Sequence, residues 1–184
     1  LKHIGFGMVN LKTGKMSSRT GQIVGGIELV DEVVERVAKI TEESEVLKGS
    51  EKEDVSEMVG LGAVKYSFLK NNPLQDVKFD IEESIAAEGN SGPYIQYTVA
   101  RCKSVLEKSE EKDGEAKDLN EEELAILRTL AKYQETVLAS AEVYSPNTLA
   151  TYLYDLAQKY NTFYNKHKIV GGESEGFKVN LTNA

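Results

Sequence analysis

One segment, residues 145–166, constrains the fold more than any other. Its apolar residues are spaced alternately by four and three positions: Leu149, Leu153, Leu156, Tyr160 and Phe163. This spacing is typical of a helix that buries one face in a bundle. Ser145 and Pro146 mark its start, because a proline in the first turn of a helix gives up no hydrogen bond. We therefore expect a long bundle helix that runs to about Lys166.

Further helices are predicted along the chain. Apolar spacing and helix start and stop signals place them over residues 28–40, 50–70, 92–108 and 120–143, with a brief one after Asp80. Ser50, with Glu53 three residues later, has the capping-box pattern for the second of these. Short strands are expected at residues 8–11 and 77–79, and the tail from Gly171 is weakly patterned. The predicted fold class is mainly α, with one or two short strands.

The composition narrows the class of protein. The 184 residues are 40% hydrophobic and 28% charged, which is typical of a soluble globular chain. No apolar run approaches the ~20 residues of a membrane span, so we expect no membrane partner. One cysteine and two histidines far apart in sequence provide no metal site, and the low cysteine content favours the cytoplasm. The net charge of −8 argues against a DNA-binding protein or any other that binds nucleic acid by bulk charge.

The charge is unevenly distributed. Residues 107–123 hold nine acidic and three basic residues, so we interpret this stretch as a solvated connector between helices. Residues 1–27 contain no acidic residue, and their cations are Lys2, Lys12, Lys15 and Arg19. This end of the chain would suit a ligand that carries phosphate.

The octet from Gly14 to Gly21, GKMSSRTG, is the most informative motif. It presents a lysine, an arginine and three hydroxyl groups between glycines, which suits phosphate binding. Its glycine spacing fits neither a Walker loop nor a dinucleotide fold. The residues alone leave open a second interpretation, a solvated turn without a ligand.

This octet resembles the KMSKS signature of class I aminoacyl-tRNA synthetases. Four further blocks resemble arginyl-tRNA synthetase and occur in the same order: residues 60–69, 79–80, 88–101 and 152–164. They read GLGAVKYSFL, FD, EGNSGPYIQY followed by Ala100 and Arg101, and YLYDLAQ followed by Asn161, Phe163 and Tyr164. Together the blocks cover nearly the whole chain.

The resemblance implies a fragment with two parts. Residues 1–88 would be the end of the catalytic domain, with the KMSKS-type loop and the region that contacts the tRNA stem. Residues 89–184 would be most of the helical anticodon-binding domain, without its last helix. Because no HIGH-type motif is present, the resemblance implies that the fragment is inactive alone, although the whole protein is an arginine-tRNA ligase.

The resemblance also assigns roles to the loop. In this family the loop acts in the activation of arginine by ATP, which precedes transfer to tRNA. It implies catalytic roles for Lys15, Ser17 and Ser18, and ATP contacts for Met8, Lys15, Met16, Ser17 and Arg19. Ser18 departs from the pattern, which has a second lysine there. Arg19 or a lysine in the absent part would then supply the second positive charge.

For tRNA binding the resemblance points to Tyr94, Tyr97 and Tyr164 near the anticodon. Aromatic rings can stack on splayed bases without a strongly basic surface. The alternative is that these tyrosines pack in a bundle core with only their hydroxyls wet. Arg101 would meet a tRNA phosphate, or else pair with a neighbouring acid.

Two alternatives remain open at this stage. Another class I enzyme, such as the cysteinyl type, has a related helical domain, but blocks 60–66 and 88–97 speak against it. The chain could also be a free-standing helical module for RNA binding or protein interaction, in which the loop at residues 14–21 would have no function. For the ligase we expect ATP with Mg²⁺ and arginine as substrates, a tRNA partner, and a monomer. We expect none of the small molecules bound to the fragment and no metal site.

Overall fold

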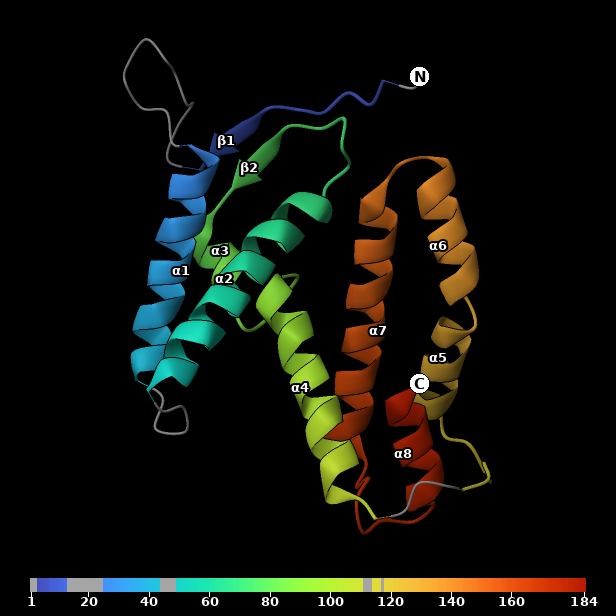
Figure 1. Ribbon diagram of the computed structural model, residues 1–184. Coiled ribbons are helices and arrows are strands. Elements are labelled where there is room, and N and C mark those ends of the chain that lie inside the picture. The colour runs from blue at the N-terminus through green and yellow to red at the C-terminus, as the bar shows by residue number, and fades with distance from the viewer. Residues whose placement is uncertain (1–2, 13–24, 44–48, 111–113, 117) are drawn as a thin grey trace. The chain divides into compact units, whose positions relative to one another are not determined.

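The computed structural model describes residues 3–12, 25–43, 49–110, 114–116 and 118–184. The chain divides into two compact units, Leu1–Gln96 and Tyr97–Ala184. Both are built mainly from helices, and the one small sheet seen in the described residues belongs to the first unit (Figure 1). The mainly α fold class is thereby confirmed. No helix in the described ranges is long and apolar enough to cross a membrane.

The first unit combines a two-stranded parallel sheet with three helices. Strand β1 (Val9–Leu11) pairs with β2 (Val77–Phe79), with Val9 opposite Val77. The connection contains α1 (Gly26–Glu42) and α2 (Ser50–Leu69), and α3 (Ile81–Ile85) follows β2. Parallel strands need such a long crossover, because the chain must return to the same end of the sheet. Both predicted strands are confirmed, the first without Met8.

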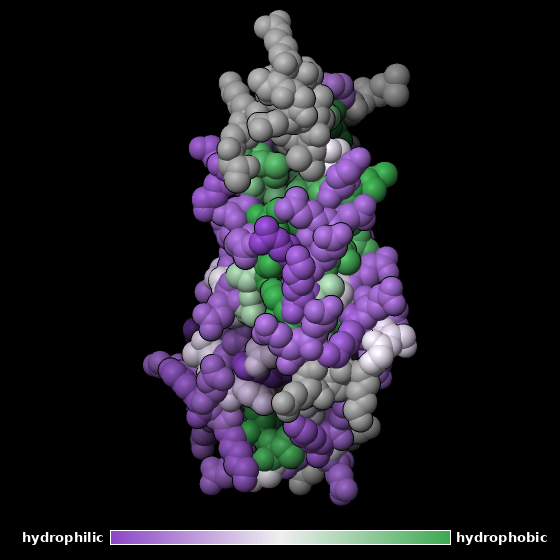
Figure 2. Space-filling view, turned by 90° about the vertical axis from the view of Figure 1, so that its left-hand side faces the viewer, coloured by the Kyte–Doolittle hydropathy of each residue, from purple (hydrophilic) through white to green (hydrophobic). Residues whose placement is uncertain are grey.

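Apolar side chains from α1, α2 and β2 form the core of this unit. Its buried members are Leu29, Val33, Ala63, Val64 and Phe79. The Phe79 ring stacks on Phe68 at a centroid distance of 5.5 Å. Figure 2 views the molecule from the side on which α1 lies and shows a largely hydrophilic surface with apolar residues between the polar ones. The buried residues of α1 are Leu29, Val33 and Val37, so one face of this helix packs inward as its amphipathic sequence predicts.

Glycines let the helices of the first unit approach closely. A Cβ on Gly60 of α2 would lie 2.7 Å from Cγ2 of Val34 and 3.0 Å from its Cα. A Cβ on Gly92 would lie 2.5 Å from the carbonyl oxygen of Gly62. Because the facing atoms include backbone, a larger residue at either position would push the elements apart. The two glycines of the Gly60-Leu61-Gly62 motif thus serve packing and leave α2 continuous.

The second unit is a helical bundle. It contains most of α4 (Gly92–Lys108), with α5 (Glu121–Leu130), α6 (Tyr133–Glu142), α7 (Pro146–Lys166) and α8 (Glu175–Asn183). Helices α5 and α6 follow one another along α7 (Figure 1). The buried apolar core consists of Val105, Ile126, Tyr160, Phe163, Ile169, Val179 and Leu181. Burial raises the pKa of the Tyr160 phenol, which keeps this core tyrosine neutral.

Local start signals predict several helices correctly. Ser91 Oγ accepts a hydrogen bond from the Tyr94 backbone N–H at 3.2 Å, and Pro93 lies in the first turn of α4. Asp80 caps α3 through the Glu83 N–H at 3.3 Å. The capping box predicted for Ser50 and Glu53 is wrong, because Ser50 is already helical. Gly49 is the N-cap, with a φ of 54° that glycine adopts without strain, and no side chain caps the helix.

The single helix predicted over residues 120–143 is also wrong. An Asn120–Glu123 capping box starts α5, which ends at Leu130, and α6 begins at Tyr133. Lys132 has ψ near zero and donates its N–H to the Thr129 carbonyl, which is a tighter turn than the α-helix makes. No proline or glycine causes this break. Both helices pack on α7, and that packing overrides the local helix propensity.

One expectation for the last long helix needs correction, and the tail after it has a defined structure. Leu153, assigned to the buried stripe of α7, is 38% exposed, whereas Tyr152 and Asn161 are buried. The buried face is wide and rotated relative to the predicted stripe because α7 packs against several neighbours. The weakly patterned tail forms α8, whose Glu175 carboxylate accepts hydrogen bonds from the Ser109 hydroxyl (2.6 Å) and the Gly171 N–H (2.7 Å).

Candidate nucleic-acid interface

Arg101 of α4 is the centre of a polar cluster in the second unit. Its Nη1 donates a hydrogen bond to Oδ1 of Asn161 on α7 at 2.6 Å. Its Nη2 donates to the hydroxyl of Tyr97 at 2.7 Å, one helical turn back on α4. Residues four apart on a helix share a face, so the position of Tyr97 follows from the sequence spacing. The bond to Asn161 joins residues 60 positions apart and depends on the bundle.

Two tyrosine rings flank the guanidinium of Arg101. Its Cζ lies 4.7 Å from the ring centroid of Tyr97 and 4.3 Å from that of Tyr164. Both distances are those of cation–π contacts. The residues are 52% and 37% exposed. The interpretation as core tyrosines therefore fails for these two, and each ring has one face covered by the arginine.

Arg101 has no acidic partner among the residues that the structure describes. The alternative that it pairs with a neighbouring acid is therefore not what the described residues show. Its two hydrogen-bond acceptors, an amide and a phenol, are both neutral. The positive charge thus stays available to an anion such as a phosphate.

Tyr94 is placed differently from the other two tyrosines. It lies one turn before Tyr97 on α4, is half-buried and belongs to the first unit. Its backbone N–H belongs to the cap at Ser91. The structure therefore brings together Tyr97, Arg101 and Tyr164 within one unit and places Tyr94 separately.

Asn161 lies in the block at residues 152–164 that resembles the family, but the sequence predicts no specific contact for it. It is only 7% exposed and donates from Nδ2 to Oγ1 of Thr98, itself 5% exposed, at 2.8 Å. The available signal was its spacing, because Asn161 precedes Tyr164 by one helical turn. Polar side chains buried this deeply in a bundle need hydrogen-bond partners. The partners of Asn161 are Thr98 and Arg101 of the candidate site.

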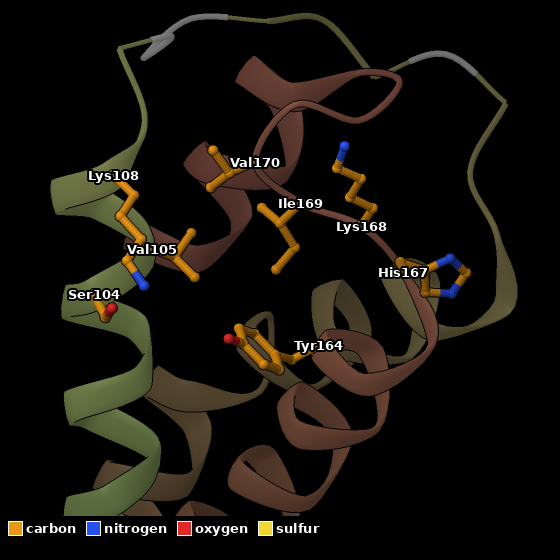
Figure 3. Close-up of a pocket in the computed structure, with 8 residues that line it drawn as sticks. All are labelled: Ser104, Val105, Lys108, Tyr164, His167, Lys168, Ile169 and Val170. Carbon is orange, nitrogen blue, oxygen red and sulfur yellow. The ribbon is translucent and has the colours of Figure 1, made fainter.

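A pocket of about 290 Å³ adjoins Tyr164 between α4 and the segment after α7 (Figure 3). It is lined by Ser104, Val105, Lys108, Tyr164, His167, Lys168, Ile169 and Val170. Figure 3 shows Val105, Ile169 and the Tyr164 ring around the central space. Its lining thus combines apolar and aromatic surface with lysines, which suits a flat, anionic ligand such as a nucleotide.

The predicted nucleotide-binding residues are only partly visible. Lys15, Met16, Ser17, Ser18 and Arg19 lie outside the described residues. Met8 is 61% exposed, its N–H donates to Oδ1 of Asp76 at 2.8 Å, and its carbonyl accepts from the Val77 N–H at 2.8 Å. Both backbone groups of Met8 are therefore already paired within the first unit.

Next to this strand, Lys12 forms an ion pair with Asp80 at 2.5 Å. The hydrogen bond that Lys12 donates to the Asp80 carboxylate raises the pKa of Lys12 and lowers the pKa of Asp80. Asp80 also caps α3, so the ion pair of Lys12 supports the local structure of the first unit. In the described ranges no group of three His, Cys, Asp or Glu residues is arranged to hold a metal ion.

Two protein families match the chain, one on each part. Residues 1–81 match the family described as tRNA synthetases class I (R), catalytic domain. Residues 95–183 match the DALR anticodon binding domain. The second match contains Tyr97, Arg101 and Tyr164.

Named relatives carry one description. The chain is 38% identical to an arginine–tRNA ligase of Bacteroides thetaiotaomicron over 189 aligned residues, which cover 97% of the chain and 32% of the relative. It is 36% identical to an arginine–tRNA ligase of Clostridium botulinum strain Langeland, again over 97% of the chain and 32% of the relative. The chain therefore spans about a third of the length of these relatives.

A solved structure gives the same fold. Arginyl-tRNA synthetase from Thermus thermophilus matches with a TM-score of 0.86 and 31% identity. The match covers 97% of the chain and 31% of that protein.

Proposed function

Because the chain belongs to the arginyl-tRNA synthetase family, we propose that it forms part of an arginine–tRNA ligase. The enzyme would activate arginine with ATP and transfer the arginyl group to tRNA. The chain carries the KMSKS-type loop but no HIGH-type signature, so the isolated chain would not form the adenylate. Residues 1–88 would serve the catalytic domain and the tRNA stem, and residues 89–184 the anticodon.

One observation carries the anticodon-binding role: a charged arginine stacked between two exposed tyrosines, with only neutral hydrogen-bond acceptors among the described residues. Arg101 covers one face of each ring, so a base would stack on the opposite face of Tyr97 or Tyr164. Each such stack contributes about 1–3 kcal/mol. The Arg101 charge would attract the adjoining phosphate, and the pocket beside Tyr164 would take part of a nucleotide.

Tyr94 would contact the tRNA as a separate element. It lies on α4 before Tyr97 and half-buries its ring, so only part of its surface is available to a base. Its contribution would therefore be smaller than that of Tyr97 or Tyr164. We assign it to tRNA binding on its position in block 88–97.

In the catalytic step we assign Lys15, Ser17 and Ser18 to the departing pyrophosphate. Charge grows on that group in the transition state, and a donor held near it contributes about 3–4 kcal/mol in comparable sites. Met8, Met16 and Arg19 would complete the contacts to ATP. Since Ser18 replaces a lysine of the usual signature, the second cation would be Arg19 or a lysine from elsewhere in the enzyme.

The partners follow from this assignment. They are an arginine-accepting tRNA, arginine, and ATP with Mg²⁺, the small molecules binding through the longer enzyme. We propose a monomer that works in the cytoplasm in protein synthesis.

The first experiment measures binding of the chain to tRNA transcripts with the arginine anticodon and with a substituted anticodon, across a salt series. Selective loss of affinity on substitution would support anticodon binding by this bundle. Equal affinity for both transcripts, with a steep salt dependence, would contradict it, because backbone charge alone would then explain binding.

The second experiment tests the ligase itself. The full-length protein is assayed for arginine-dependent exchange of pyrophosphate into ATP, with Lys15→Ala as the variant. We expect loss of the exchange reaction in the variant, with the fold unchanged by circular dichroism. A full-length protein that binds tRNA but never exchanges pyrophosphate would indicate the alternative, a helical RNA-binding module.

A further inference from the structure

We propose that Asn161 is a positioning residue for the tRNA-binding arginine. Asn161 itself is too buried, at 7% exposed, to offer a broad contact surface to RNA. It would act through Arg101, whose guanidinium it holds between the two tyrosine rings. The inference rests on the proposed anticodon-binding function of this cluster.

The hydrogen bond to Asn161 restricts where the Arg101 side chain can lie. An arginine side chain has many rotamers, and only a few place its guanidinium against both Tyr97 and Tyr164. Tyr97 lies on the same helix, one turn away, so its hydroxyl moves with Arg101 and cannot fix the arginine relative to α7. The 2.6 Å bond from Nη1 to Oδ1 of Asn161 is the described hydrogen bond that ties Arg101 to α7, the helix of Tyr164.

The orientation of the Asn161 amide decides whether it can hold the arginine. Asn161 can anchor Arg101 only if its oxygen, and not its NH₂ group, faces the guanidinium. Nδ2 of Asn161 donates to Oγ1 of Thr98 at 2.8 Å, which places Oδ1 on the other side. Thr98 precedes Arg101 by three residues on α4 and therefore lies on the same face of the helix. In the structure the Asn161 amide therefore meets Thr98 through its NH₂ group and Arg101 through its oxygen.

The side chain of Asn161 is neutral, and this matters for the charge of Arg101. An aspartate at position 161 would be nearly isosteric and could still accept the hydrogen bond from Arg101. It would also neutralise the guanidinium, as Glu82 does for Arg36 in the first unit. An asparagine holds the arginine and leaves its charge for the phosphate. A neutral amide is therefore the chemical choice for positioning a cation that must bind an anion.

The test uses the full-length ligase with three variants: Asn161→Asp, Arg101→Gln and the double variant. We measure the dissociation constant for arginine tRNA between low and high salt. For Asn161→Asp we expect about tenfold weaker binding, and a slope of log affinity against log salt that is smaller by about 0.7, as for one lost phosphate contact. In the Arg101→Gln background, the aspartate should have no further effect.

A charge-matched control and a second variant separate positioning from folding. Gln158→Glu adds a carboxylate on the same helix, where the Gln158 amide donates to the Tyr154 hydroxyl (3.1 Å), and should leave tRNA affinity within twofold. Asn161→Leu removes the anchor without adding charge. It should weaken binding and leave the salt slope nearer to that of the wild type, because the arginine is misplaced but still charged.

The outcomes are distinguishable. The positioning role would be overturned if Asn161→Asp bound tRNA with wild-type affinity. It would also be overturned if the double variant lost affinity by the product of the two single effects. Both results would leave the anticodon site intact. Unchanged affinity for Arg101→Gln would overturn both the positioning role and the proposed binding site.

Discussion

Arg36 in the first unit and Arg101 in the second both lie on helices but have opposite surroundings. Arg36 lies on α1 and contacts two carboxylates, Glu82 at 2.5 Å and Glu32 at 3.9 Å. Arg101 lies on α4 between two tyrosine rings and bonds only neutral acceptors among the described residues. The first charge is compensated within the fold, whereas the second remains available. An overall acidic chain can therefore still present a cation to RNA, if the acids are kept away from it.

One aromatic contact in each unit shows the same difference. Phe79 is 2% exposed and stacks on Phe68 inside the first unit. Tyr97 and Tyr164 stack on Arg101 at the surface of the second. The first contact is part of a core, whereas the second is made by two partly exposed residues. The comparison therefore predicts that stability and tRNA affinity depend on different aromatic residues.

The largest effect is expected for Phe79→Ala. Removing a buried phenylalanine leaves a cavity and should lower the free energy of unfolding by about 3–5 kcal/mol. Tyr164→Ala, at a surface position, should lower it by no more than about 1 kcal/mol. Denaturation by urea, followed by circular dichroism, measures both. Equal losses for the two variants would show that Tyr164 contributes as much to stability as the core residue Phe79 does.

Tyr164→Leu should act on binding instead. Loss of one stacked base is expected to weaken tRNA binding by about 1–3 kcal/mol, measured by filter binding or fluorescence anisotropy. Tyr133→Leu is the matched control, because Tyr133 is 51% exposed and its ring packs near Tyr152 in the same unit. A similar loss in the control would show that exposed aromatic surface in general, and not this cluster, holds the RNA.

A smaller effect is expected for Arg36→Gln. Exposed ion pairs contribute little, so the free energy of unfolding should fall by about 0.5 kcal/mol or less, and high salt should remove the difference. Affinity for tRNA should not change, since the Arg36 charge is already compensated. Thermal unfolding at two salt concentrations, together with the binding assay, tests both statements. A tRNA defect in this variant would contradict the distinction between the two arginines.

The smallest effect concerns Glu122, the acid that pairs Lys166 (2.5 Å) and His167 (3.1 Å) in the second unit. The hydrogen bond from Lys166, and then that from His167, lowers the pKa of Glu122 from 4.5 to about 2. Because the folded pKa is the lower one, this stabilisation is present above about pH 5 and is lost as the pH falls towards 2. In Glu122→Gln, stability should decline less steeply over that interval. Identical pH profiles would show that the pair contributes nothing.

Helix existence followed from local signals, and helix breaks did not. Ser91 and Pro93 mark the start of α4 within four residues of sequence, so the prediction needed no tertiary information. The break between α5 and α6 has no breaking residue, because packing on α7 causes it. The exposure of Leu153 has the same origin. Local propensity cannot anticipate which neighbours a helix will have.

The candidate site shows the same division. The resemblance to a family supplied Tyr97, Arg101 and Tyr164, and helical spacing placed Tyr97 beside Arg101. No sequence pattern indicated that the arginine would lie between the rings, or that Asn161 would hold it. That contact joins positions 60 residues apart, so only the folded bundle brings it about. The catalytic loop residues, outside the described ranges, stay predictions.

The parallel pairing of β1 with β2 has a kinetic consequence. Each β1 residue meets a partner 68 positions later, so the pair closes a long loop whose entropy must be lost before the contact gains anything. In the second unit, α5, α6 and α7 meet neighbours that are close in the chain, and such local contacts form quickly. During synthesis β1 must wait without its partner until residue 79 has emerged. The core of the bundle joins Val105 to Val179 and Leu181, so the second unit also has to wait for the end of its segment before its core is complete.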